Sequence, residues 1–137
     1  RFFLALAYKA LKLVAGTEAA YQRGLENAEA HLEKNPDDSR AYYLGALALV
    51  ELGDREKGLE WAHKAVSLDA HNPLLFYNIS CFFSIAGELE DAIGYFRKAA
   101  EGFVGVDVSI KDWAENDPDL EPIRSDPRFQ EILATLA

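Results

Sequence analysis

The sequence predicts an all-α, right-handed solenoid of about seven major helices, in which successive helix pairs stack on one another. Apolar residues recur at helical spacing in several segments, and Gly and Pro punctuate those segments. Small residues recur every 34 positions, at Gly24, Gly58 and Ala92. A fixed period of this length in a helical sequence is typical of stacked helix-turn-helix units. The 137 residues, half of them hydrophobic, suffice for one domain of this kind.

The period extends beyond the small residues. Further sets with the same spacing are Leu25, Leu59 and Ile93; Ala28, Ala62 and Phe96; and Tyr8, Tyr42 and Phe76. Small side chains allow two antiparallel helices to approach closely, whereas a large one would cost about 1–3 kcal/mol by overpacking. We therefore expect Gly24, Gly58 and Ala92 where the two helices of each pair come closest.

The N-terminal part predicts two helices. Residues 1–15 are apolar around most of their circumference, which predicts a buried or amphipathic helix ending near Gly16. The apolar run is too short to span a membrane. A second helix is expected from Thr17, as its N-cap, to about Lys34, where Asn35–Pro36 ends it.

The middle of the chain predicts the clearest helix pair. Ser39 is a candidate N-cap for a helix over residues 39–52, and Gly53 ends that helix in the left-handed conformation that Gly adopts at little cost. Asp54 is placed to cap the next helix, over residues 55–68.

The C-terminal half predicts a second pair and a closing helix. Pro73 begins a helix over 73–86 that Gly87 ends, and another runs from Glu88 to about Glu101. Asp126–Pro127 starts the last helix. Residues 107–137 are expected to cover the last pair with Trp113, Leu120, Ile123 and Phe129, because an open solenoid end must be covered. The expected core comprises Tyr42, Ala46, Leu49, Leu59, Ala62, Ala65, Phe76, Ile79, Phe83, Ile93, Phe96 and Ala99.

These positions resemble the signature of the tetratricopeptide repeat (TPR). In residues 39–72 the matching positions are Tyr42, Gly45, Ala46, Leu49, Gly58, Ala62 and Ala65, and in residues 73–106 they are Phe76, Ile79, Ser80, Phe83, Ala92, Phe96 and Ala99. Residues 5–38 resemble a degenerate first repeat, which departs from the family at His31 and at its early turn, Gly16–Thr17. The resemblance implies about three helix pairs in one domain, followed by the closing segment 107–137.

The stretch from Trp113 to Phe129 is similar to a segment that follows the last repeat in bacterial multidomain signalling proteins, such as nucleotide cyclases, Ser/Thr kinases and transcription regulators. This resemblance, together with a first residue that is Arg, implies a fragment of a larger cytoplasmic signalling protein. In such a protein the repeats would act as a regulatory scaffold or adaptor.

Composition and motifs argue against several other functions. The net charge of -9 is unsuited to binding nucleic acid, which requires clustered basic groups. A single cysteine excludes an internal disulfide. His31, His63, His71 and Cys81 lack metal-ligand spacing, so no metal is expected. The chain shows no nucleotide or dinucleotide fingerprint and no catalytic constellation, so we expect neither a cofactor nor an enzyme.

The expected function is to bind a peptide or protein partner in a concave groove lined by the first helix of each pair. The candidate residues lie opposite the packing arcs of helices 39–52 and 73–86: Arg40, Tyr43, Leu44, Leu47, Val50 and Glu51 on the first, and Leu74, Tyr77, Asn78, Cys81, Ser84 and Ile85 on the second. An apolar strip with two tyrosines, an Asn and an Arg suits a peptide with apolar anchors.

Two alternatives remain open. In the first alternative, the apolar strip on helices 39–52 and 73–86 is covered, either by residues 107–137 or by a neighbouring domain of the parent protein. In the second, the repeats mediate self-association of the parent, and residues 1–15 are the candidate surface for a second copy.

Overall fold

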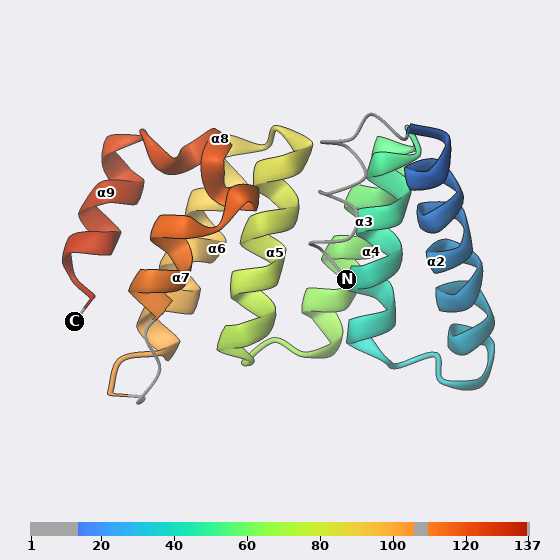
Figure 1. Cartoon of the computed structure of the whole chain (residues 1–137). Helices are drawn as coiled ribbons and strands as arrows, with labels where there is room; N and C mark the ends of the chain where they lie inside the picture. The colour runs from blue at the N-terminus through green and yellow to red at the C-terminus, as the bar shows by residue number, and fades with distance from the viewer. Residues whose placement is uncertain (1–13, 106–109, 137) are drawn as a thin grey trace. The chain divides into compact units, whose positions relative to one another are not determined.

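The computed structural model describes residues 14–105 and 110–136, and all regular structure among them is helical (Figure 1). The chain divides into two compact units, of which the first ends at Leu68 and the second begins at Asp69. Adjacent helices pack against one another in antiparallel pairs within each unit, and the all-α fold class predicted from the sequence is confirmed. The helix expected over residues 1–15 falls almost wholly outside the described residues, and so does the surface expected there for a second copy. No described helix is both long and apolar enough to cross a membrane.

Unit 1 contains three described helices: α2 (Val14–Lys34), α3 (Ser39–Glu51) and α4 (Arg55–Leu68). The predicted turn between the last two is confirmed, because Gly53 has a positive φ of 97° and the Asp54 carboxylate accepts the Lys57 N–H at 3.3 Å.

Two predicted boundaries in unit 1 are wrong. α2 begins at Val14 and continues through Gly16 and Thr17, so no turn separates two helices there. A glycine inside a helix costs only about 1 kcal/mol relative to alanine, which a long helix tolerates. The N-cap of α3 is Asp38, not Ser39: Asp38 has the extended backbone that a cap requires, and its carboxylate accepts the N–H of Arg40 at 3.0 Å.

The core of unit 1 depends on one aromatic side chain and two glycines. Trp61 packs edge-on to Tyr42, with 5.4 Å between the ring centroids, and a Cβ added to Gly45 would lie 2.6 Å from Trp61 Cε3. At Gly58 an added Cβ would lie 2.7 Å from Val50 Cγ2, which confirms the close approach of α3 and α4. The prediction of a close helix contact is wrong for Gly24, which is exposed and has no neighbouring atom within 4 Å of an added Cβ.

Unit 2 starts with a helix pair, α5 (Pro73–Ala86) and α6 (Leu89–Gly102). Asn72 caps α5, and Gly87 ends it with a positive φ of 81°, as predicted. The hydroxyl of Ser80, one of the positions that match the repeat signature, donates to the Ala92 carbonyl of α6 at 2.7 Å. Across both units the predicted core residues are buried, except that Tyr42 and Leu59 are half-buried.

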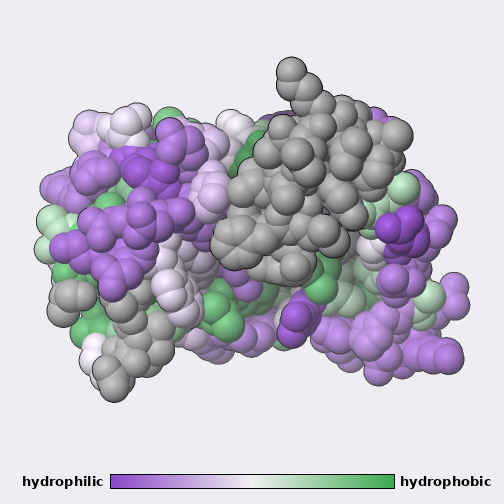
Figure 2. Space-filling model, viewed as in Figure 1, coloured by the Kyte–Doolittle hydropathy of each residue, from purple (hydrophilic) through white to green (hydrophobic). Residues whose placement is uncertain are grey.

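The closing segment packs on this pair and contains α7 (Ile110–Asn116), a single 3-10 turn η1 (Pro118–Leu120), α8 (Glu121–Arg124) and α9 (Pro127–Ala134). Phe129 of α9 lies against Phe96 of α6, with ring centroids 4.5 Å apart. Leu120 and Ile123 are also buried, whereas Trp113, expected in the same cover, is 48% exposed. The visible outer surface of the closing segment is mostly hydrophilic (Figure 2), because its apolar side chains face α5 and α6.

Candidate functional site

In unit 1 the predicted groove residues of α3 border a real cavity. A space of about 540 Å³ lies between α2 and α3. From α3 it is lined by Arg40, Leu44 and Leu47, three residues that helical periodicity places on one face. The lining is mainly apolar, since Ala28 and Ala41 complete its floor. This arrangement leaves a concave apolar surface that an inserted side chain can fill.

The remaining predicted residues of α3 are placed differently. Tyr43 is only 5% exposed, and Val50 and Glu51 are half-buried and do not line this cavity. Arg40 is exposed at the cavity edge. The α3 face therefore offers one cation beside two leucines, and Tyr43 is a packing residue, not an exposed contact.

The other wall of the cavity was not found by sequence reasoning. It consists of residues that α2 presents at successive helical turns: Tyr21, Gly24, Asn27, Ala28 and His31. Their spacing of three and four residues marks one face of a helix, but the early turn predicted at Gly16 obscured which helix that face belongs to.

His31, where the sequence departs from the repeat pattern, lies at the end of α2. Its side chain is 47% exposed, and its Nε2 lies 2.6 Å from the Asp38 carboxylate. The His31 hydrogen bond holds the pKa of Asp38 below its ordinary value, helped by the N–H groups of Ala41 and Arg40. One carboxylate thus caps α3 and also ties the end of α2 to it.

In unit 2 the corresponding residues of α5 are largely covered. Tyr77, Cys81 and Ser84 are each no more than 5% exposed, Asn78 and Ile85 are half-buried, and only Leu74 is exposed. At Tyr77 and Cys81 the cover is the closing segment, which is one of the two alternatives that the sequence left open. The part of the strip around Tyr77 therefore has an occupant from the same chain.

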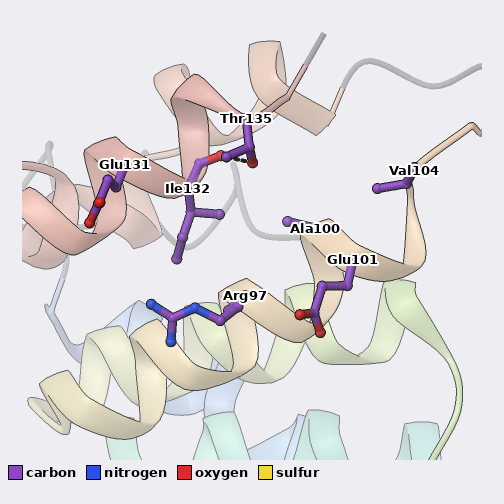
Figure 3. Close-up of a pocket in the computed structure, with 7 residues that line it drawn as sticks. All are labelled: Arg97, Ala100, Glu101, Val104, Glu131, Ile132 and Thr135. Atoms are coloured by element: carbon purple, nitrogen blue, oxygen red, sulfur yellow. Dashed lines mark hydrogen bonds between the residues drawn. The ribbon is translucent and has the colours of Figure 1, made fainter.

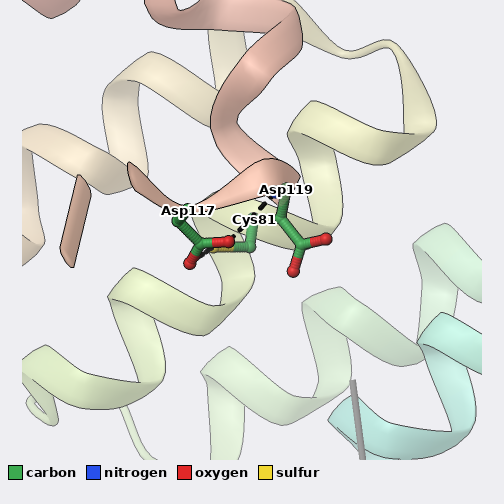
Figure 4. Close-up of side chains that lie close together, drawn as sticks. All are labelled: Cys81, Asp117 and Asp119. Atoms are coloured by element: carbon green, nitrogen blue, oxygen red, sulfur yellow. Dashed lines mark hydrogen bonds between the residues drawn. The ribbon is translucent and has the colours of Figure 1, made fainter. Parts of the chain in front are cut away.

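The contacts at that place are polar as well as apolar. The Tyr77 hydroxyl donates to Asp117 Oδ2 at 2.9 Å. Cys81 Sγ lies 3.7 Å from the same oxygen, and Figure 4 shows Cys81 beside Asp117 and Asp119. The indole of Trp113 lies edge-on to the Tyr77 ring, with centroids 6.0 Å apart. Burial, above all, raises the pKa of Tyr77, and the neighbouring Cys81 and Asp117 add to the shift. The phenol therefore stays a hydrogen-bond donor.

Three groups of the kinds that bind metals meet at this point, although the sequence spacing shows no metal site. The ligand atoms of Cys81, Asp117 and Asp119 lie within 4.8 Å of one another. Internal bonds already engage Asp117, because its Oδ1 accepts the Asp119 N–H at 3.0 Å and its Oδ2 accepts the Tyr77 hydroxyl. We interpret the cluster as a link between the closing segment and α5.

A second cavity, of about 430 Å³, lies between α6 and α9 (Figure 3). Ala100 and Ile132 provide its apolar floor, and Arg97, Glu101 and Glu131 stand around it. None of the residues in the predicted groove lines this cavity.

The antiparallel helix pairs and the close contact at Gly58 are consistent with a TPR-like helical repeat. Over 56 residues, or 41% of the chain, the sequence is 32% identical to a TPR repeat-containing protein of Methanocaldococcus jannaschii. The matched region covers 10% of that protein, so the chain spans only a small part of this relative. No family model matches the sequence.

Proposed function

We propose that this chain is a non-catalytic protein-interaction module, which binds a peptide or protein partner in the α2–α3 cavity. The observation that carries the proposal is that Arg40, Leu44 and Leu47, selected from the sequence by periodicity, line an apolar cavity of about 540 Å³. Apolar pockets with a few polar groups are the usual form of a site that anchors side chains of a ligand. The similarity to a TPR repeat-containing protein supports the same class of function.

The cavity indicates the chemistry of the partner. Leu44, Leu47 and Ala28 suit an apolar anchor residue, while the exposed Arg40 suits an acidic residue next to that anchor. A helical or extended peptide with both features fits this surface. We further propose that the chain is the regulatory part of a larger bacterial cytoplasmic signalling protein, which rests on the resemblance of the segment from Trp113 to Phe129.

The test uses peptides selected from a displayed random library on the immobilised chain. Their affinities are then measured by isothermal titration for the wild type, for Leu44→Glu and for a matched control, Leu89→Glu, which changes an exposed leucine of α6. Loss of an anchor contact should weaken binding about 30-fold or more in Leu44→Glu. The control should bind like the wild type.

Equal affinity of the selected peptides for Leu44→Glu and the wild type would contradict the proposed site. The double change Tyr43→Ala and Tyr77→Ala is a poor test, because both rings are buried and their loss perturbs folding. Light scattering after size exclusion separates partner binding from self-association: a dimer that Leu44→Glu dissociates would favour the second function.

A further inference from the structure

The contact between α5 and the closing segment has the form of a bound peptide. Tyr77 and Cys81 lie one helical turn apart on α5, and both direct their donors at Asp117 Oδ2, 40 and 36 residues away along the chain. Donors that converge on one carboxylate oxygen are the usual means of recognising an acidic side chain. Both donors belong to the strip that the sequence assigns to partner binding.

The segment seated on this strip combines a charged residue with an apolar anchor. Asp117 is followed by Pro118, which opens η1, and three residues after Asp117 the Leu120 side chain is fully buried. η1 makes most of its contacts outside the closing segment with α5. In a short peptide on a helical groove, a hydrogen-bonded acidic residue fixes the orientation and a buried leucine supplies the affinity.

The segment around η1 and α9 each make contacts of their own within unit 2. Arg128 of α9 makes a two-pronged ion pair with Glu90 of α6, with both N–O distances 2.8 Å, and Phe129 packs on Phe96. η1 is instead tied to its own neighbours, because Arg124 donates to the carbonyls of Ala114 and Asp117. α8 also contacts α6 and α9, and Gln130 of α9 donates to the Arg124 carbonyl at 2.6 Å. Residues 117–124 therefore lift from α5 only when these contacts break, while the Arg128–Glu90 ion pair still holds α9 on α6.

We propose that the α5 strip is a second recognition site, which the chain's own Asp117–Leu120 segment occupies. Its external ligand is a protein segment of the same chemistry, with an Asp followed directly by Pro and, two residues later, by Leu. Such a partner displaces residues 117–124, so its apparent affinity is its intrinsic affinity reduced by the fraction of molecules that are open. This site lies in unit 2 and does not depend on the α2–α3 cavity of unit 1, so each proposal can fail without the other.

Hydrogen exchange on the intact chain tests whether the segment opens by itself. Amides of residues 117–124 should exchange at least about 100-fold faster, after correction for intrinsic rates, than the buried amides of the α5–α6 pair. Asp117→Asn keeps a capping side chain but removes the charge that Tyr77 and Cys81 face, and it should raise that local exchange about tenfold without changing the α5–α6 amides. If the amides of residues 117–124 exchange as slowly as the buried amides of the α5–α6 pair, they exchange only through global unfolding, and this result would overturn the proposal.

Binding in trans tests recognition itself. The probe is a fluorescent peptide with the sequence of residues 115–126, measured by anisotropy against the full chain and its Leu120→Ala variant, which loses the anchor of the internal segment. The variant should keep its helical circular dichroism and bind the peptide at least about tenfold more tightly than the wild type does. Adding Tyr77→Phe to the variant should weaken that binding about tenfold while leaving the dichroism unchanged.

Three results would overturn the inference. The first is equal binding of a control peptide in which the Asp and Leu corresponding to Asp117 and Leu120 are both Ala. The second is no gain in peptide binding by a folded Leu120→Ala chain. The third is loss of helical dichroism in that variant, because residues 117–124 would then be inseparable from the fold.

Discussion

Replacing Gly58 with alanine should destabilise unit 1, although alanine is the better helix former. The helix itself gains about 0.5–1 kcal/mol from the change. The new Cβ would lie 2.7 Å from Val50 Cγ2 and 3.0 Å from the Ala46 carbonyl oxygen. A backbone oxygen cannot move aside, and a valine in a helix has essentially one side-chain rotamer, so overpacking should cost about 1–3 kcal/mol. The net loss is expected to be about 1 kcal/mol.

The matched control is Gly24→Ala, one repeat earlier. Gly24 lies inside α2 with open space around an added Cβ, so this variant should gain up to about 1 kcal/mol. Urea unfolding followed by Trp61 fluorescence, in a Trp113→Phe background that removes the signal of unit 2, should show the Gly58→Ala midpoint falling and the Gly24→Ala midpoint rising. Equal shifts of both midpoints in one direction would refute the close contact of α3 and α4.

Three further perturbations follow from the structure. Gly45→Ala should lower the melting temperature, because the added Cβ occupies the space of the Trp61 ring, and an unchanged calorimetric transition would contradict this packing. Phe129→Ala should cost about 3–5 kcal/mol, since the ring is fully buried, and chemical denaturation of a variant as stable as the wild type would show that α9 is not part of the fold. Because the folded pKa of Asp38 is depressed, its contribution is present above the ordinary carboxyl pKa of 3.8 and is lost as the pH falls through the folded value. Asp38→Asn removes the titrating carboxyl but keeps a capping side chain. The variant's free energy of unfolding should therefore fall less steeply with pH below about pH 4 than that of the wild type, and an equal fall would exclude Asp38 as the cause.

The helices could be predicted from the sequence where a breaker has a local cause. Gly53 and Gly87 end their helices with a positive φ, and Pro73 starts one, because each effect depends on the residue itself. The turn predicted at Gly16 is wrong, since a glycine inside a helix looks the same in sequence as one at a helix end. The choice of Asp38 over Ser39 as N-cap is of the same kind, because both residue types cap helices well.

The candidate site could be predicted only in part, because helical periodicity gives the face of a residue but not what covers it. Leu44 and Leu47 line a cavity between α2 and α3, whereas the groove expected from the sequence ran along helices 39–52 and 73–86. The wall that α2 contributes depends on how two helices pack. The Tyr77–Asp117 hydrogen bond joins residues 40 positions apart, and no spacing rule connects them. Only the apolar residues around Leu120 indicated that the closing segment packs at all.

The two halves of the predicted strip differ in their neighbours as well as in sequence, since the tyrosine is the one residue that they share. Tyr43 and Tyr77 hold equivalent positions 34 residues apart and are equally buried. The Tyr77 hydroxyl donates a hydrogen bond to a carboxylate of the closing segment. Moving a carboxylate out of water carries a desolvation cost, which only well-placed hydrogen-bond donors offset. An acidic residue next to a purely apolar core would therefore lower the stability of the fold. Tyr77 and Cys81 both supply donors to Asp117, so this contact favours an acidic residue over a neutral one at that place. That selectivity is what a recognition surface needs and what a simple apolar cover does not.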